Sequence, residues 1–233
     1  GSSAGLFDFL TVTTGSSKIV NSPLGITGLF GGLSVLLIFL YPSIIGVTVY
    51  RDYKSEMHTI LYSYPFTKLQ YLLAKFFSGI FVVNIIVLIV ALGIGIGFVL
   101  PGTNQEIVQS FDFKSYSDVY LIYILPNMLF IGAIVFGIVT FTRNISAGFI
   151  TVLILLISQG FLVSLFDDPE KRLIAAILDP FGDSAIQYYT RYWTVSEQNE
   201  LYLPIREVLI YNRLLWGALG IILFGAIYKI FSF

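Results

Sequence analysis

The amino-acid sequence predicts an all-α, polytopic membrane protein that crosses the bilayer five times. Charged residues make up 12% of the chain, about half of the roughly 25% found in soluble domains. The charges are also segregated, because five runs contain no Asp, Glu, Lys or Arg: residues 19–50, 76–105, 119–142, 145–166 and 214–228. A helix needs about 20 apolar residues to cross a hydrocarbon core about 30 Å thick. Four of the runs are long enough, and residues 230–233 complete the fifth because Lys229 can reach the interface.

Other classes of protein fit the sequence less well. A soluble fold would have to bury five such helices, and a chain of 233 residues has too little polar surface to cover them. The strands of a membrane β-barrel would alternate with period two over about 10 residues. The absence of cysteine excludes disulfides, thiolate metal sites and cysteine nucleophiles. A net charge of −1 gives no indication of nucleic-acid binding.

The chain begins with a polar segment, residues 1–23, followed by the first span at about 24–50. Gly28, Gly31 and Gly32 allow a neighbouring helix to approach closely. Pro42 is expected to kink this span, because proline removes a backbone donor.

The connection after the first span, residues 51–64, is predicted to be an amphipathic helix. Its apolar residues recur at helical spacing on one side: Tyr53, Met57, Ile60, Leu61 and Tyr64. Polar residues take most of the remaining surface: Arg51, Asp52, Lys54, Ser55, Glu56 and His58. Two interpretations stay open, since such a helix either rests on lipid headgroups or docks on a cytosolic partner.

The remaining spans follow in order. Pro65 ends the amphipathic helix, and Thr67 is a predicted N-cap with Gln70 as its capping-box partner. The later spans are expected at about 72–100, 119–141, 145–166 and 213–233. The polar segment 167–212 is expected to hold short interfacial helices at 171–178 and 184–193, separated by the turn signal Asp179-Pro180-Phe181-Gly182.

The distribution of basic residues predicts the orientation. Lys and Arg accumulate in cytoplasmic loops, and the connection between the first two spans carries Arg51, Lys54, Lys68 and Lys75. We therefore assign that connection and Arg143 to the cytosol, with 1–23 and 167–212 outside and the C-terminus inside. Five spans with an outside N-terminus lead us to expect a sixth span, N-terminal to this segment, in the full protein.

Three amide side chains lie clearly within predicted spans: Asn84, Asn127 and Gln159. Such residues usually form hydrogen bonds between helices. The alternative is that they line a substrate path, and the sequence alone leaves both possibilities open.

Motifs for catalysis are not found in the sequence. There is no Walker-type Gly-x-x-x-x-Gly-Lys-Ser/Thr, so ATP hydrolysis is not expected in this chain. His58 is the only histidine, which rules out His-Glu-x-x-His and makes a catalytic triad implausible. We therefore expect a non-enzymatic chain without a cofactor or a metal of its own.

The order of span, amphipathic helix, proline corner and span resembles the permease subunits of ABC-2 type exporters. That family carries an acidic residue, a proline-centred turn and a basic residue in this region, and Glu56, Tyr64-Pro65-Phe66 and Lys75 fill those places. Later motifs resemble the membrane half of bacterial permeases fused to an M1-type aminopeptidase: Asp179-Pro180-Phe181-Gly182, Tyr192-Trp193-Thr194, Glu197, Asn199 and Asn212-Arg213-Leu214-Leu215-Trp216.

The resemblance implies a permease of the bacterial inner membrane that pairs with a second copy or a similar permease. ATP and Mg²⁺ would be bound by a partner ATP-binding cassette ATPase. The expected contact residues for that ATPase are Arg51, Tyr53, Lys54, Glu56, Met57, His58, Ile60 and Leu61. A membrane scaffold that moves no substrate is the alternative, and a secondary transporter would require an ionisable residue deep in a span. The sequence does not indicate the cargo.

Overall fold

The computed structural model describes residues 19–57, 65–100, 107–166 and 168–231, and these residues form helices and loops without a strand. Four helical stretches are long and apolar enough to cross a membrane, and a bent helix pair makes a fifth. The described elements are α1 Pro23–Leu37, the π-helical turn η1 Pro42–Gly46, α2 Val47–Lys54, α4 Lys68–Gly97, α5 Phe113–Asp118, the π-helical turn η3 Val119–Ile124, α6 Leu125–Thr142, α7 Ile145–Phe166, α8 Arg172–Leu178, α9 Asp183–Thr190, α10 Val195–Glu200 and α11 Glu207–Ile230. The predicted polytopic α-helical membrane protein is confirmed.

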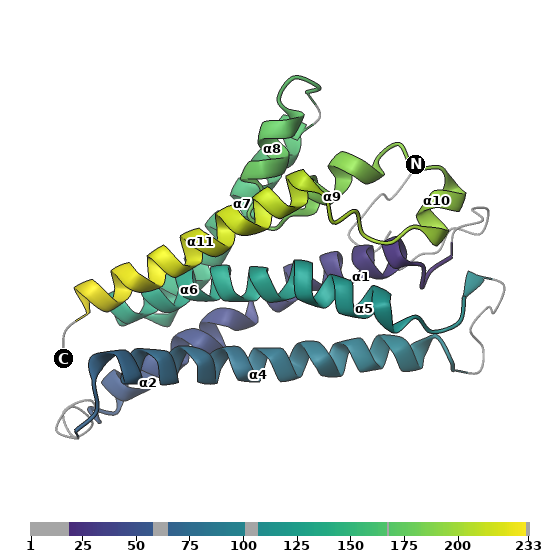
Figure 1. Cartoon of the computed structure of the whole chain (residues 1–233). Coiled ribbons are helices and arrows are strands. Elements are labelled where there is room, and N and C mark those ends of the chain that lie inside the picture. Colours follow the sequence, from purple (N-terminus) through teal and green to yellow (C-terminus); the bar gives the residue numbers. More distant parts are fainter. Residues whose placement is uncertain (1–18, 58–64, 101–106, 167, 232–233) are drawn as a thin grey trace, which may run out of the picture.

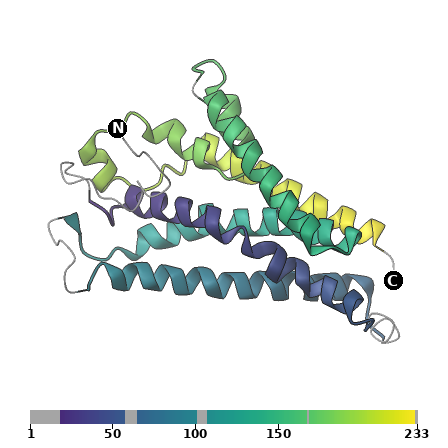
Figure 2. The same ribbon diagram turned by 180° about the vertical axis from the view of Figure 1, so that it is seen from behind.

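The long helices form an elongated bundle with two distinct ends (Figure 1). Helix α4 and the continuous stretch α5–η3–α6 run side by side, and the view from behind shows α1 and α2 following the same direction (Figure 2). The last turn of α2, the first turn of α4 and the C-terminus share one end, which we call the α2–α4 end. The short helices α8, α9 and α10 gather at the other, the α8–α10 end.

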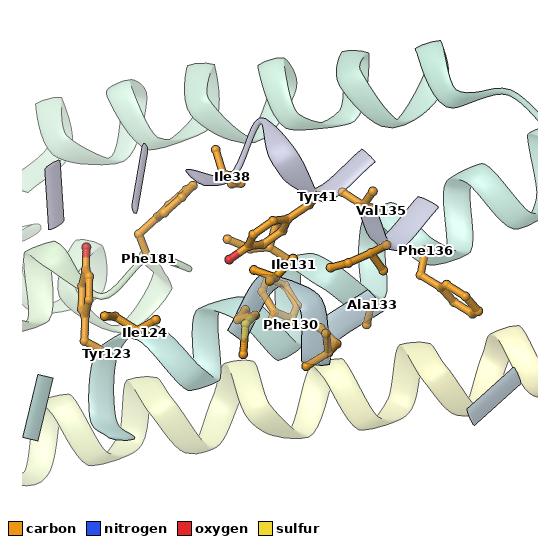
Figure 3. Close-up of a cluster of buried hydrophobic side chains, with 14 of the residues drawn as sticks. Ile38, Tyr41, Tyr123, Ile124, Phe130, Ile131, Ala133, Val135, Phe136 and Phe181 are labelled. Carbon is orange, nitrogen blue, oxygen red and sulfur yellow. The ribbon is translucent and has the colours of Figure 1, made fainter. Parts of the chain in front are cut away.

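Helix α6 is the centre of the bundle. Within the described residues, α6 belongs to the stretch Phe113–Thr142, whose most apolar part is 67% buried, compared with 22% for α4, 11% for α7 and 17% for α11. A helix that is apolar all round is expected to be buried in this way. Its side chains form a carbon core with residues from the bend of the first span and from the segment between α8 and α9 (Figure 3): Phe130, Ile131, Ala133, Val135 and Phe136 with Ile38, Tyr41 and Phe181.

The first span is bent. Its arms, 23–37 and 42–54, meet at 47°. Pro42 begins the π-helical turn η1 at this point, where a proline cannot continue the backbone ladder. The predicted kink at Pro42 therefore coincides with a real break in the helix.

The prediction of a single helix over residues 51–64 is wrong for the first half of that range. Residues 51–54 are the last turn of α2, so the helix of the first span runs four residues beyond Tyr50. A turn follows at 55–57, in which Glu56 has a left-handed backbone with φ 55°. The Ser55 hydroxyl donates to the Arg51 carbonyl oxygen at 2.7 Å and helps to close the helix end. Residues 58–64 lie outside the described residues.

The other helix boundaries agree better with the sequence. The capping box at the start of α4 is present, with Thr67 and Gln70 bonded in both directions. Helix α7 has the expected bounds, and α8 and α9 lie close to the two expected short helices. Helix α11 begins at Glu207 rather than 213, and the third span begins at Phe113 rather than 119. Helix α10 was not expected, although Thr194 and Glu197 form a capping box at its start.

We expect Gly79→Ala to destabilise the bundle. A β-carbon at Gly79 would lie 2.8 Å from the Cα atom of Ile45, which is backbone and cannot rotate away. Overpacking of this kind costs about 1–3 kcal/mol. The check is the thermal unfolding midpoint in detergent micelles.

Gly93→Ala on the same helix is the matched control. A β-carbon at Gly93 meets nothing within 4 Å, so its midpoint should stay level or rise, because alanine favours a helix over glycine by up to about 1 kcal/mol. Equal midpoints for both variants would show that α4 and η1 are not closely packed at Gly79.

Candidate functional site

The α2–α4 end contains a buried ion pair between the first two spans. The Asp52 side chain on α2 is buried, with the residue 6% exposed. On α4, Lys75 places its Nζ atom 2.6 Å from Oδ2 of Asp52. The hydroxyl of Tyr71, one turn earlier, donates to the same oxygen at 2.9 Å. The end of the first span is therefore tied to the beginning of the second.

The burial of Asp52 corrects the sequence analysis, which placed it on the exposed surface. Because α2 continues the first span, Val49 and Asp52 share the face that packs inward, and both are buried. The ion pair was also missed. The only sequence signal was the spacing of Tyr71 and Lys75, which are four residues apart and so share one face of α4.

Aromatic rings extend this connection to the end of the last span. The ring of Tyr71 stacks with Phe66 at 6.0 Å and with Phe231 at 5.8 Å between centroids. Lys68 donates to the carbonyl oxygen of Phe231 at 2.6 Å and lies 4.7 Å from the ring centroid of Tyr228. The segment before α4 and the end of α11 are thus held together.

The connection between α6 and α7 reaches the same end of the bundle. Arg143 has a left-handed backbone with φ 52°, which ends α6. Its guanidinium lies 4.3 Å from the ring centroid of Tyr53 on α2, a distance at which a cation is attracted to an aromatic face. Contacts from α4, α11 and the α6–α7 connection therefore meet at this end of the bundle.

Five of the residues expected to contact an ATPase are described, and they flank Asp52 of the ion pair in the chain: Arg51, Tyr53, Lys54, Glu56 and Met57. Among those described, four are exposed: Arg51, Lys54, Glu56 and Met57. Tyr53 is partly buried beneath Arg143. His58, Ile60 and Leu61 lie outside the described residues, so their role as contact residues stays a prediction.

A second polar site anchors the hairpin of α8 and α9 to the spans. Asp179 is fully buried, and its carboxylate accepts hydrogen bonds from the backbone N–H groups of Phe181 at 2.9 Å and Ser184 at 2.7 Å. Gly182 between them has φ 87°, a conformation that favours glycine. Asn212 of α11 donates to the backbone carbonyl oxygens of Ala176 and Asp179, both at 2.8 Å. The predicted turn is therefore present and tied to the last span.

Arg213 extends from α11 beneath this turn. It donates to the side-chain oxygens of Asn127 at 2.7 Å and Asn212 at 2.8 Å. Asn127 on α6 in turn donates to the carbonyl oxygen of Phe181 at 2.7 Å. A β-carbon at Gly182 would collide with the guanidinium of Arg213. The turn therefore favours glycine for its backbone conformation, and a side chain there would also displace the guanidinium of Arg213 from its hydrogen bonds.

The three amide residues identified within the predicted spans each bond across helices. Asn127 bonds as just described, and Gln159 of α7 donates to Asp183 at 3.4 Å. Both therefore contact the α8–α9 hairpin. Asn84 lies apart and donates to the hydroxyl of Tyr120. These contacts fit the packing interpretation, and the alternative, that the three amides line a substrate path, stays a prediction.

The carboxylate of Asp183 combines burial with a neighbouring negative charge. Burial and the charge of Asp179 raise the pKa of Asp183 from 3.8 to about 6, while the hydrogen bond from Tyr123 and the nearby Arg213 act in the opposite direction. Asp183 was not identified from the sequence. No group of three His, Cys, Asp or Glu residues suited to a metal ion occurs among the residues that the structure describes.

The fold defines a class of protein, a multi-pass helical membrane protein whose spans are joined by polar contacts at both ends. A family model described as ABC-2 family transporter protein matches residues 23–190. The chain therefore belongs to the ABC-2 transporter family, and it is a transmembrane permease of an ABC transporter rather than a catalytic subunit. No curated protein and no solved structure matches it.

A double-mutant cycle should reveal the coupling between Asp52 and Lys75. Each of Asp52→Asn and Lys75→Met leaves its partner without a counter-charge, and we expect each to lower the free energy of unfolding by about 2–3 kcal/mol. This range allows for the partial exposure of the lysine side chain, which is 22%. The double variant should lose about 1–3 kcal/mol less than the sum. Additive losses in chemical denaturation would show that the two groups do not interact.

Asp183 should make stability fall as the pH rises. A carboxyl whose pKa is higher in the folded state binds its proton more tightly there, so this contribution is complete below the unfolded pKa of 3.8 and is lost as the pH passes about 6. The raised pKa of Asp183 contributes about 2–3 kcal/mol to the free energy of unfolding at low pH. We expect Asp183→Asn to flatten the pH dependence of the unfolding midpoint between about pH 4 and about pH 7.

Asp168→Asn is the control for this titration. The pKa of Asp168 is lowered by its hydrogen bond with Lys171, so its titration falls below that window. The unfolding midpoint of Asp168→Asn should therefore change with pH in the same way as that of the unsubstituted protein. If the midpoint of Asp183→Asn still falls as the pH rises, another group is responsible for the pH dependence.

Proposed function

We propose that this chain is the permease of an ABC exporter and that the α2–α4 end receives the movement of a partner ATPase. The observation that carries the proposal is the buried ion pair of Asp52 with Lys75, reinforced by Tyr71. It lies directly behind the exposed residues that follow the first span. A force applied to those residues therefore acts on two spans at once.

The exposed surface at this end has the chemistry of a docking site. Arg51 and Lys54 place positive charge in the last turn of α2, and Met57 exposes 48% of its surface beyond it. An apolar side chain framed by charges suits an interface, because the apolar group is desolvated and the rim charges set the register. In this proposal His58, Ile60 and Leu61 complete the contact.

ATP binding would act by favouring one of two arrangements of the bundle. A ligand shifts such an equilibrium only as far as its affinities for the two states differ. Closure of two ATPase subunits would hold residues 51–57 in one position, and the contacts to α4 and α11 would carry that position into the spans. Rigid-body movement of packed helices is a common form of this response.

The remaining parts of the proposal follow from the same assignment. The α2–α4 end faces the cytosol and the α8–α10 end faces outward in a bacterial inner membrane. ATP and Mg²⁺ are bound by the ATPase, and a second copy or a similar permease completes the transporter. The motifs around Asp179 and Asn212 support a relationship to permeases fused to an aminopeptidase.

Met57→Asp should weaken the association with the ATPase. The change places a charge at the centre of the proposed contact, and a desolvated interface side chain contributes about 2 kcal/mol or more. We expect a clear loss of co-purification when the variant is co-expressed with the ATP-binding cassette subunit that co-purifies with the unsubstituted chain. ATP turnover of the complex in proteoliposomes should lose its dependence on the permease.

Leu201→Asp is the matched control at the opposite end of the bundle. Leu201 exposes 43% of its surface, close to the value for Met57. The substitution Leu201→Asp should leave co-purification with the ATPase unchanged. Association and ATP turnover that survive Met57→Asp would contradict the proposal. Normal association without transport of any lipid, peptide or glycan substrate would instead favour a membrane scaffold.

A further inference from the structure

A large apolar cavity opens on the outside of the bundle, away from the residues proposed to meet the ATPase. Its volume is about 1010 Å³, and it is lined by α1, α4, α5 and η3. Its deep wall contains Phe30 and Val87, which are each 2% exposed. Its rim contains Leu92 and Leu121, which are 66% and 57% exposed. The cavity therefore faces whatever surrounds the spans, which in a membrane is hydrocarbon.

Small residues on α4 create this space. Ala91 and Gly95 are four residues apart and both line the cavity, so they leave one face of α4 without bulk. The lining of α4 runs from Val87 to Ile96 within the helix, which is about 14 Å at 1.5 Å per residue. One leaflet of the hydrocarbon core is about 15 Å thick. The lining on α4 is thus about as long as one leaflet of the hydrocarbon core is thick, which is the depth that an acyl chain occupies.

A smaller polar pocket adjoins the apolar cavity. It has a volume of about 340 Å³ and shares Gly95, Val99 and Phe111 with the larger one. Its lining includes the polar residues Asn21, Gln109 and Ser110. The two spaces together present a long apolar chamber with amide and hydroxyl groups at one end. That distribution matches an amphiphile whose tail and polar head are joined end to end.

An unpaired hydroxyl lies where the two spaces meet. The OH group of Tyr116 is buried and has no hydrogen-bond partner in the part of the chain that the structure describes. Tyr116 lines the apolar cavity, and a β-carbon on Gly95, which lines both spaces, would lie 3.8 Å from this oxygen. A buried hydroxyl is costly unless it is bonded. An ester carbonyl of a lipid at this level would accept its proton.

We propose that this cavity binds one membrane phospholipid, with an acyl chain between α4 and η3 and the glycerol ester region at Tyr116 and the adjoining polar pocket. The ligand enters from the bilayer through the rim formed by Leu92 and Leu121. The site lies on the α8–α10 side of the bundle and is independent of the α2–α4 end. Loss of ATPase association and loss of lipid binding are therefore separate outcomes.

The test uses the full chain in nanodiscs that contain a phosphatidylethanolamine with a diazirine midway along one acyl chain. After illumination, mass spectrometry of peptides should show saturable labelling, to one lipid per chain, at residues 87–96 and 116–124. The exposed face of α7 should be labelled without saturation, because ordinary boundary lipid exchanges there. Labelling that is uniform over all spans and does not saturate would overturn the proposal.

Ala91→Trp and Ile89→Trp form a matched pair on α4. Ala91 lines the cavity, whereas Ile89 is 62% exposed and lies outside the lining. Ala91→Trp should reduce labelling of residues 116–124 about five-fold or more, since the indole obstructs the cavity beside Gly95 and close-packed walls leave the acyl chain no room to pass it. Ile89→Trp should change it by less than about two-fold. Equal labelling in both variants would overturn the proposal.

Two further measurements test the lipid site without relying on the Ala91→Trp variant. Tyr116→Phe should weaken retention of the lipid about five-fold, as expected for one hydrogen bond. Leu92→Cys should not crosslink two copies of the chain under oxidation in membranes. Efficient crosslinking would mean that a helix of a second copy fills the cavity, and unchanged retention in Tyr116→Phe would remove the ester contact from the proposal.

Discussion

The ion pair of Asp52 with Lys75 fixes how the first two spans sit relative to each other. Lys75 lies seven residues after the start of α4 at Lys68, about 10 Å along the helix. An unpaired ammonium at the bilayer centre would cost about 2.5–3.5 kcal/mol, whereas here the ammonium lies near the start of the helix and is paired with a buried carboxylate. The pair also fixes the register between α2 and α4, because Tyr71 and Lys75, one turn apart on α4, both bond the carboxylate of Asp52.

The opposite end of the bundle uses a different kind of anchor. There, the buried Asp179 organises a turn through backbone N–H groups, and Asn212 and Arg213 of α11 bind that turn to α6. Between the two ends the contacts are almost entirely carbon against carbon around α6. Carbon contacts have no preferred direction, whereas the polar anchors do. Within the described residues, the spans are thus oriented mainly by the polar contacts at their ends, with the hydrogen bond from Asn84 to Tyr120 as a directional contact between them.

The gaps between charges in the sequence predict the spans well and the helix ends poorly. Helix α7 matches its expected range, since charges flank it closely on both sides. Helix α2 continues past its expected end to Lys54, and α11 begins before its expected start, at Glu207. Hydropathy indicates the part of a helix that lies in the membrane, and the helix can continue beyond that part. The burial of Asp52 depends on Lys75, across a proline corner, and no local pattern encodes that pairing. The amides in the spans were identified, but their hydrogen-bond partners were not: Asn127 and Gln159 bond to the α8–α9 hairpin, and Asn84 bonds to Tyr120.

The bend at Pro42 divides one span between two neighbourhoods. The arm before the bend, α1, packs on α5, η3 and α10, and the arm after it packs on α4, α6 and α7. A straight rod that tilts must displace lipid in both leaflets together. A bent span has two arms that pack on separate sets of helices, so the contacts that hold one arm are not those that hold the other. The two halves of the first span are therefore anchored independently of each other.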